Sequence, residues 1–140
     1  MELIVTLLNC LIFLLLAALH LYWVFGGKWG MDAAIPTQGN GKKLFRPGRL
    51  ATLVVALGLI AFAVINLAHA GWVSLGIRPQ YLDAGLLVIS LIFLFRAVGD
   101  FRYLGFTKRH RQSLFAKRDT FFYSPLCLVL GAFHLFIFLY

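Results

Sequence analysis

The chain has 140 residues, of which 61% are hydrophobic and only 13% are charged, and its formal net charge is +8. Soluble domains carry about 25% charged and about 45–50% apolar residues, because they need a surface that water wets. With a mean hydropathy of +0.88, this chain cannot build such a surface, and we expect lipid to surround most of it. The composition excludes an ordinary cytosolic enzyme, a disordered chain and a disulfide scaffold.

Four long apolar segments follow one another along the chain. They cover about residues 3–25, 50–69, 84–103 and 121–140. Each is close to the ~20 residues that a helix needs to cross a hydrocarbon core of ~30 Å. The segments show no two-residue alternation, which favours helices over barrel strands. The first segment has no basic leader and no A-x-A cleavage site, so we predict a permanent helix there and not a signal peptide.

The basic residues are concentrated in two of the three connections. Five Lys or Arg separate the first two spans, one separates the second from the third, and six lie between Arg102 and Arg118. The positive-inside bias then predicts an inner-membrane protein with cytoplasmic first and third connections and with both termini outside. Because this topology accounts for the net charge, we expect no nucleic-acid partner.

Polar residues inside the spans fall on the same helix faces as small residues, as lipid requires of groups turned into a bundle. The sequence therefore predicts an all-α fold, an antiparallel bundle of four transmembrane helices that forms one domain over residues 1–140. A rise of about 1.5 Å per residue divides the polar residues into two groups at different depths. The inner group contains His20, Arg96 and Asp100, and the outer group contains Asn9, Cys10, Asn66, His69 and His134.

The inner group admits two interpretations. Arg96 and Asp100 lie four residues apart on the predicted third helix, so we expect them to pair, since a charge in a bilayer is costly without a partner. A functional interpretation is a pocket for an anion or headgroup, with Arg96 as the fixed positive charge and His20 as a titratable partner. The structural interpretation is an ion pair together with a histidine bonded to a backbone carbonyl.

The outer group raises the question of a cofactor. His69 and His134 are candidates for the axial ligands of a haem, but their estimated depths differ by about 8 Å. We therefore predict no cofactor and retain haem only as an alternative. Cys10 and Cys127 form no C-x-x-C pair, and no spacing typical of metal ligands occurs, so no metal site is predicted. The sequence also lacks H-E-x-x-H, G-x-S-x-G and Walker motifs.

Three segments carry a resemblance to a known family. The run RAVGDFRYLGF at residues 96–106, FAKRD at 115–119 and YSPLCL at 123–128 resemble a family of small bacterial four-span membrane proteins, known only as a domain of unknown function. His-Leu-Tyr-Trp at residues 20–23 adds a weaker match. The resemblance implies a four-helix inner-membrane protein and no particular activity. It also implies importance for His20, Trp23, Arg96, Gly99, Asp100, Arg102, Asp119, Ser124 and Pro125.

Together these observations predict a membrane protein that binds a small anionic or amphiphilic ligand in a pocket on the cytoplasmic side, for transport or regulation. The expected ligand-binding residues are His20, Trp23, Arg96, Asp100, Arg102 and Asp119. One alternative is a membrane enzyme acting on a lipid-soluble substrate, and another is a structural accessory subunit without a pocket. The expected partners are membrane lipids and this ligand, and self-association into a homo-oligomer stays open.

Overall fold

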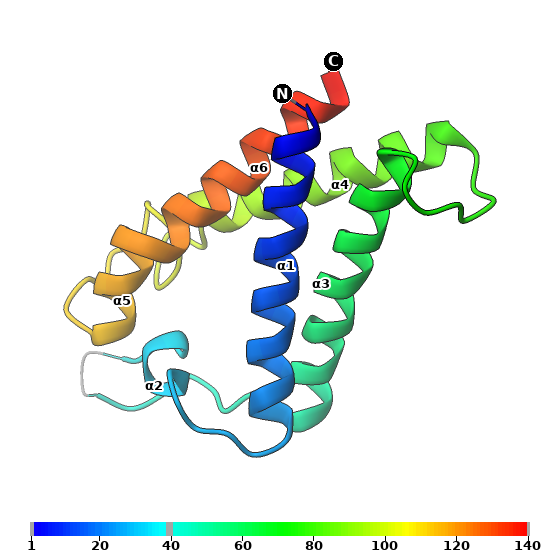
Figure 1. Ribbon diagram of the computed structural model, residues 1–140. Helices are drawn as coiled ribbons and strands as arrows, with labels where there is room; N and C mark the ends of the chain where they lie inside the picture. The colour runs from blue at the N-terminus through cyan, green and yellow to red at the C-terminus, as the bar shows by residue number, and fades with distance from the viewer. Residues whose placement is uncertain (1, 39–40, 140) are drawn as a thin grey trace.

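The computed structural model describes residues 2–38 and 41–139, and the long elements in this part of the chain are helices. The elements are α1 (Glu2–Val24), α2 (Met31–Ala34), α3 (Arg49–His69), α4 (Pro79–Val98), α5 (Leu114–Arg118), the π-helix η1 (Asp119–Tyr123) and α6 (Ser124–Leu139). Successive long helices run in opposite directions, and both termini lie at one end of the molecule (Figure 1). The predicted all-α, four-helix fold is confirmed.

Four helical stretches are long and apolar enough to cross a membrane: α1, α3, α4 and the continuous run Leu114–Leu139, formed by α5, η1 and α6. The chain is therefore a multi-pass membrane protein. Helix α4 begins and ends earlier than the expected range of 84–103, because Pro79 suits the first turn of a helix and Gly99 ends it. Gly99 has a φ of 92°, which an α-helix cannot continue.

The four long helices form two antiparallel pairs. Helix α1 packs along α3, and α4 packs along α6, with the pairs crossing at an angle (Figure 1). Around the crossing, the Phe13 ring stacks on Phe93 at 5.5 Å and meets Phe62 edge-on at 5.7 Å. The buried apolar core that surrounds these rings contains Cys10, Ala17, Leu59, Ala63, Ile89 and Leu130.

Small residues allow α4 and α6 to approach closely. A Cβ atom added at Gly131 would lie 2.7 Å from Cγ of Leu94, so only glycine fits without a shift. At the same place the Ser90 hydroxyl donates a hydrogen bond of 2.8 Å to the Gly131 carbonyl oxygen. Close backbone contact and interhelical hydrogen bonds replace the hydrophobic effect as the source of helix association in lipid.

The first and third connections meet at the end of the molecule opposite the termini. Short helix α2 lies against α5 (Figure 1), and the Tyr123 hydroxyl of η1 donates to the Ala33 carbonyl oxygen at 3.1 Å. Thr37 and Lys43 form an isolated β-bridge within the first connection. We call this end, which carries both basic connections, the basic end.

Candidate functional site

The connection after α4 folds back onto the helix from which it came. The Phe106 N–H donates to the Ala97 carbonyl oxygen at 2.9 Å, and the Thr107 hydroxyl donates to that of Val98 at 2.7 Å. These bonds satisfy carbonyl groups that the end of a helix leaves free. The two backbone segments touch at Gly99 and Gly105, where an added Cβ would lie 1.8 Å from the Leu104 oxygen or 2.3 Å from the Val98 oxygen. Both positions require glycine.

Asp100 organises the turn that follows. Its Oδ1 accepts backbone N–H groups from Arg102 at 2.9 Å, Tyr103 at 2.6 Å and Leu104 at 2.8 Å. Desolvation by itself would raise the pKa of Asp100, but the N–H bonds from Leu104, Tyr103 and Arg102 outweigh it and hold the pKa below its ordinary value. The expected pairing of Asp100 with Arg96 is wrong, because α4 ends at Val98 and the carboxylate turns onto its own loop.

Arg96 pairs instead with Asp119, the first residue of η1. Its Nη2 donates to Oδ1 of Asp119 at 2.8 Å, while Oδ2 accepts from Lys108 Nζ at 2.9 Å and from the Gly105 N–H at 2.8 Å. The side chains of Asp119 and Lys108 are both 0% exposed. We call Arg96, Gly105, Lys108 and Asp119 the Asp119 cluster. It carries two positive charges and one negative charge, and it fixes the loop to the start of the last membrane helix.

The π-helical turn gives Asp119 its position. Ser113 caps α5 by accepting the Ala116 N–H at 3.0 Å, and the helix then widens over Asp119–Tyr123 before α6 begins. A π-turn inserts one residue into a helix and is frequent at functional sites. Here it places the buried carboxylate toward the loop while Tyr123 reaches the first connection.

Arg96 keeps one donor unused. Its Nη1 is buried and has no hydrogen-bond partner among residues 2–38 and 41–139, although the side chain as a whole is 30% exposed. Buried guanidinium groups ordinarily have their N–H groups bonded. Nη1 could therefore bond an anion only after the partly exposed Arg96 side chain turns outward.

A hollow of about 440 Å³ lies beside the Asp119 cluster and is lined by Asp100, Phe101, Arg102, Arg109 and His110. We call it the basic hollow. The His110 ring stacks on Tyr103 at 4.7 Å, and its Nδ1 donates to the Arg102 carbonyl oxygen at 3.3 Å. Phe101 is 62% exposed and has a φ of 61°, a left-handed conformation that is rare for a bulky residue.

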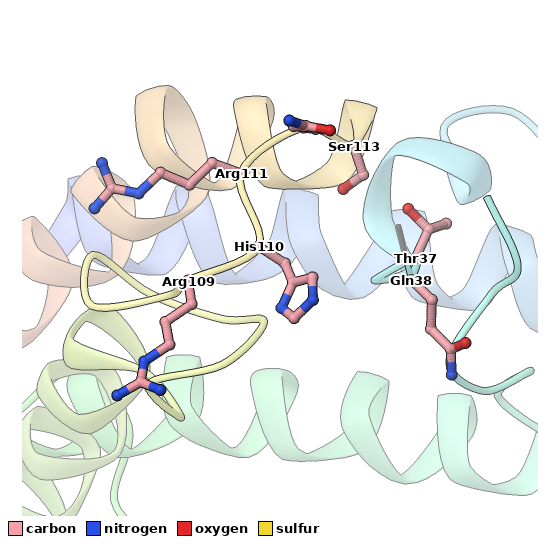
Figure 2. A pocket seen from close by; sticks show the side chains of 7 residues that line it. Thr37, Gln38, Arg109, His110, Arg111 and Ser113 are labelled. Atoms are coloured by element: carbon pink, nitrogen blue, oxygen red, sulfur yellow. The ribbon is translucent and has the colours of Figure 1, made fainter. Parts of the chain in front are cut away.

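Figure 2 shows a second hollow, of about 350 Å³, between the first and third connections. His110 lies at its centre, facing Thr37 and Gln38, while the guanidinium groups of Arg109 and Arg111 extend away to the opposite side. This hollow is consequently lined mainly by neutral polar groups. Arg109 also lines the basic hollow, where a second arginine, Arg102, accompanies it.

His20 and Trp23 form a separate pair at the end of α1. Their rings meet edge-on at 5.0 Å, and Nδ1 of His20 donates to the Leu16 carbonyl oxygen at 2.7 Å. The Trp23 indole N–H donates to the Trp29 carbonyl oxygen at 2.8 Å. The bond from His20 to a backbone carbonyl is the one that the structural interpretation expects.

The structure thus divides the six expected site residues into three groups. Arg96 joins Asp119, Asp100 and Arg102 line the basic hollow, and His20 pairs with Trp23. Sequence reasoning missed Lys108, which it counted as one of the basic loop residues, and Gly105. One signal pointed to the cluster: a buried arginine needs an acid, and Asp119 belongs to the FAKRD segment.

The outer histidines have protein partners. Nε2 of His69, the last residue of α3, lies 3.2 Å from Oδ1 of Asp83, near the start of α4. His134 is bonded through both ring nitrogens, to the Leu130 carbonyl oxygen at 2.7 Å and to the Asn66 amide at 3.0 Å. A haem iron bound by His134 would have to displace one of these bonds. No group of three or more His, Cys, Asp or Glu suited to a metal occurs within the described ranges.

Four membrane-spanning helices with a structured, basic connection at one end define a small polytopic integral membrane protein. Residues 13–134 match the family described as "Protein of unknown function (DUF3995)", and the chain belongs to this family. The match contains the basic hollow and the whole Asp119 cluster, and it confirms the resemblance found in the sequence. The comparisons with curated proteins and with solved structures each gave no match.

Proposed function

We propose that this membrane protein binds an anionic amphiphile at the basic end, with the headgroup in the basic hollow. The observation that supports this proposal most directly is the exposed Phe101 ring, which a left-handed backbone conformation holds beside Arg102 and Arg109. The positive-inside bias supports a cytoplasmic position for this end in the inner membrane. Binding there would serve regulation or transport of the amphiphile.

The charge of the hollow suits an anionic headgroup. Two exposed arginines and one histidine face a single carboxylate, Asp100, whose Oδ1 accepts three backbone N–H groups. Planar guanidinium groups match carboxylate and phosphate oxygens in pairs of hydrogen bonds. Basic residues at a membrane surface attract anionic lipids with about 1 kcal/mol each. The two arginines together therefore account for about 2 kcal/mol, or roughly a 30-fold gain in affinity.

Phe101 suits the apolar part of the ligand. A left-handed conformation costs an L-residue with a Cβ roughly 1–2 kcal/mol and persists only where the surrounding structure enforces it. Here the N–H groups bonded to Asp100 and the contact between Gly99 and Gly105 enforce it. The result is an exposed ring at the rim of a charged hollow, next to the apolar surface of α4, whose last turns also expose Phe95.

The remaining expected site residues support the same ligand in different ways. The unused Nη1 of Arg96 is proposed as a further donor for the headgroup once the side chain, which is 30% exposed, turns outward. Asp119 positions the loop by holding Arg96 and Lys108, and does not contact the ligand. His20 and Trp23 are proposed contacts for the ligand from the end of α1.

One observation favours a second candidate, the structural accessory subunit. Both oxygens of Asp119 are bonded within the protein, and His20 has a backbone partner, so these groups have structural explanations. If the protein is a structural accessory subunit, no anionic amphiphile binds selectively in the basic hollow. A binding measurement therefore separates the two candidates.

The test uses the purified full chain in nanodiscs of zwitterionic lipid, titrated with dodecyl phosphate and observed by native mass spectrometry. Dodecyl phosphocholine serves as the zwitterionic control ligand. We expect selective binding of dodecyl phosphate, weakened roughly 30-fold in the double variant Arg102→Ala/Arg109→Ala. The matched control Lys117→Ala/Arg118→Ala removes two exposed basic residues from α5 and should change affinity less than twofold.

Two results would contradict the proposal. Unchanged binding in the Arg102→Ala/Arg109→Ala variant would show that the hollow does not hold the headgroup. An equal loss of affinity in the control variant Lys117→Ala/Arg118→Ala would show that binding depends only on the total charge of the basic end. The single variant Phe101→Gly adds a separate readout, since it should relieve about 1 kcal/mol of backbone strain and still weaken binding.

A further inference from the structure

A second group of polar residues is buried in the bundle, away from the basic end. Asn9 of α1, Asn66 of α3 and His134 of α6 are 0%, 1% and 0% exposed. The Asn66 amide nitrogen donates to Nε2 of His134 at 3.0 Å and to the Phe62 carbonyl oxygen at 2.8 Å. Because Nδ1 of His134 donates to a backbone carbonyl, Nδ1 carries the hydrogen and Nε2 is the acceptor.

Asn9 lies at the same level as the other two. It precedes Phe13 by one helical turn on the same face of α1, and the Phe13 ring lies 5.4 Å from the His134 ring and 5.7 Å from the Phe62 ring. Asn66 follows Phe62 by one turn, and α3 runs antiparallel to α1 (Figure 1). Three helices therefore bring Asn9, Asn66 and His134 together on the side of Phe13 that faces the chain termini.

This group has unused hydrogen-bonding capacity. Both side-chain amide atoms of Asn9 and Oδ1 of Asn66 are buried without a hydrogen-bond partner anywhere in the described part of the chain. Neighbouring polar groups do find partners: the Cys10 thiol donates to the Ala63 carbonyl oxygen at 3.5 Å, and Ser90 bonds Gly131. A buried amide without hydrogen-bond partners is costly in an apolar interior.

We propose that Asn9, Asn66 and His134 form an internal binding site for water. The unused groups are two acceptor oxygens and one donor nitrogen, and a water molecule offers both donors and acceptors to such a set. Buried water in proteins typically makes about three hydrogen bonds to groups of this kind. An ion is a poor occupant because no charged side chain belongs to the set, and an apolar ligand would leave the same groups without partners.

The site is closed toward the basic end. Phe13, Phe62 and Phe93 form an aromatic layer in which ring centroids lie 5.5–6.2 Å apart, and Phe13 is fully buried. This layer separates the bound water from the Asp119 cluster. The aromatic layer therefore closes the water site on the side of the basic end.

Solid-state NMR of the uniformly ¹⁵N-labelled full chain in bilayers tests this site through magnetisation transfer from water to side-chain and backbone nitrogens. We expect transfer to the side-chain amides of Asn9 and Asn66 at least fivefold faster than to the backbone amide of Phe93. The near-isosteric variant Asn9→Leu should reduce transfer to Asn66 at least threefold. The control Ser90→Ala, which removes a hydroxyl that already has a partner, should leave transfer to Asn66 unchanged.

The wild-type measurement alone can overturn the proposal, so the outcome does not depend on any variant folding. No transfer to either amide, or a direct bond between the two side chains detected through their chemical shifts, would show that the amides satisfy each other without water. Unchanged transfer to Asn66 in Asn9→Leu would overturn the shared site, because the Asn66 amide would then receive magnetisation from water without any contribution from Asn9.

Discussion

Replacing Asp119 by asparagine keeps the shape of the side chain but removes the negative charge that holds two cations. Lys108 is 0% exposed, so its ammonium group would stay buried without a counterion. Removing one partner of a buried ion pair costs about 3–5 kcal/mol. Arg96 is 30% exposed and can turn toward headgroups or water, so most of the cost arises at Lys108. We therefore expect Asp119→Asn to lower the free energy of unfolding by about 3–5 kcal/mol.

Equilibrium unfolding in mixed micelles with increasing dodecyl sulfate measures this loss through the helical circular dichroism signal. The matched control is Asp32→Asn, which removes the carboxylate of an exposed ion pair with Lys43 in the first connection. Because water screens that pair, the control should unfold like the wild-type chain. Adding Lys108→Met to Asp119→Asn removes the unpaired charge and should restore part of the lost stability.

Two results would refute this reasoning. One is a decrease in the free energy of unfolding that is no larger in Asp119→Asn than in Asp32→Asn. That result would mean that the Asp119 cluster does not hold the loop. The other is a double variant Asp119→Asn/Lys108→Met that is less stable than Asp119→Asn alone. That result would mean that Lys108 acts through the hydrogen bond that its Nζ donates to the Gly105 carbonyl oxygen at 2.8 Å, and not through its charge.

Three further predictions concern the loop and its place in the membrane. Gly105→Ala should destabilise the fold in the same unfolding assay, because its Cβ would meet a backbone oxygen at 2.3 Å and its φ is 77°. The pKa of Asp100 is lower in the folded protein than in the unfolded chain, where it is about 3.9. The ionised carboxylate therefore stabilises the loop fully above about pH 3.9, and this stabilisation disappears as the pH falls through the pKa of the folded protein. Amide exchange at residues 102–104 should accordingly lose protection below about pH 4, but not in Asp100→Asn. In a cysteine-free background, an impermeant thiol reagent should label Ser74→Cys in intact cells and Lys117→Cys only after lysis, and the reverse pattern would contradict the proposed orientation.

The number and type of membrane helices could be predicted from the sequence because lipid leaves little choice. Backbone groups in hydrocarbon must bond within a helix, so each long apolar run, such as residues 3–25, becomes one. The boundaries of α4 could not be read in the same way. The aromatic residues Phe101 and Tyr103 follow soon after Val98 and extend the expected span, but the helix ends where Gly99 adopts a positive φ. Hydropathy carries no information on that backbone angle.

The site was harder to predict, since its contacts depend on the loop. A spacing of four residues brings Arg96 and Asp100 together only if the helix continues through both. The true partner, Asp119, lies 23 residues further on and is placed by a π-turn that no simple periodicity indicates. Lys108 was missed because a lysine in a basic loop is ordinarily solvated, whereas here the fold buries it completely.

The distance along the chain between Arg96 and its counterion has a consequence for biosynthesis. A ribosome that adds roughly 5–20 residues per second needs about one to five seconds to extend the chain by the 23 positions from Arg96 to Asp119. During that interval the guanidinium group of Arg96 lacks the carboxylate that binds it in the folded protein. Asp119, at the start of η1, then supplies that carboxylate. Completion of the chain, and not insertion of α4, thus determines when the basic end acquires its final form.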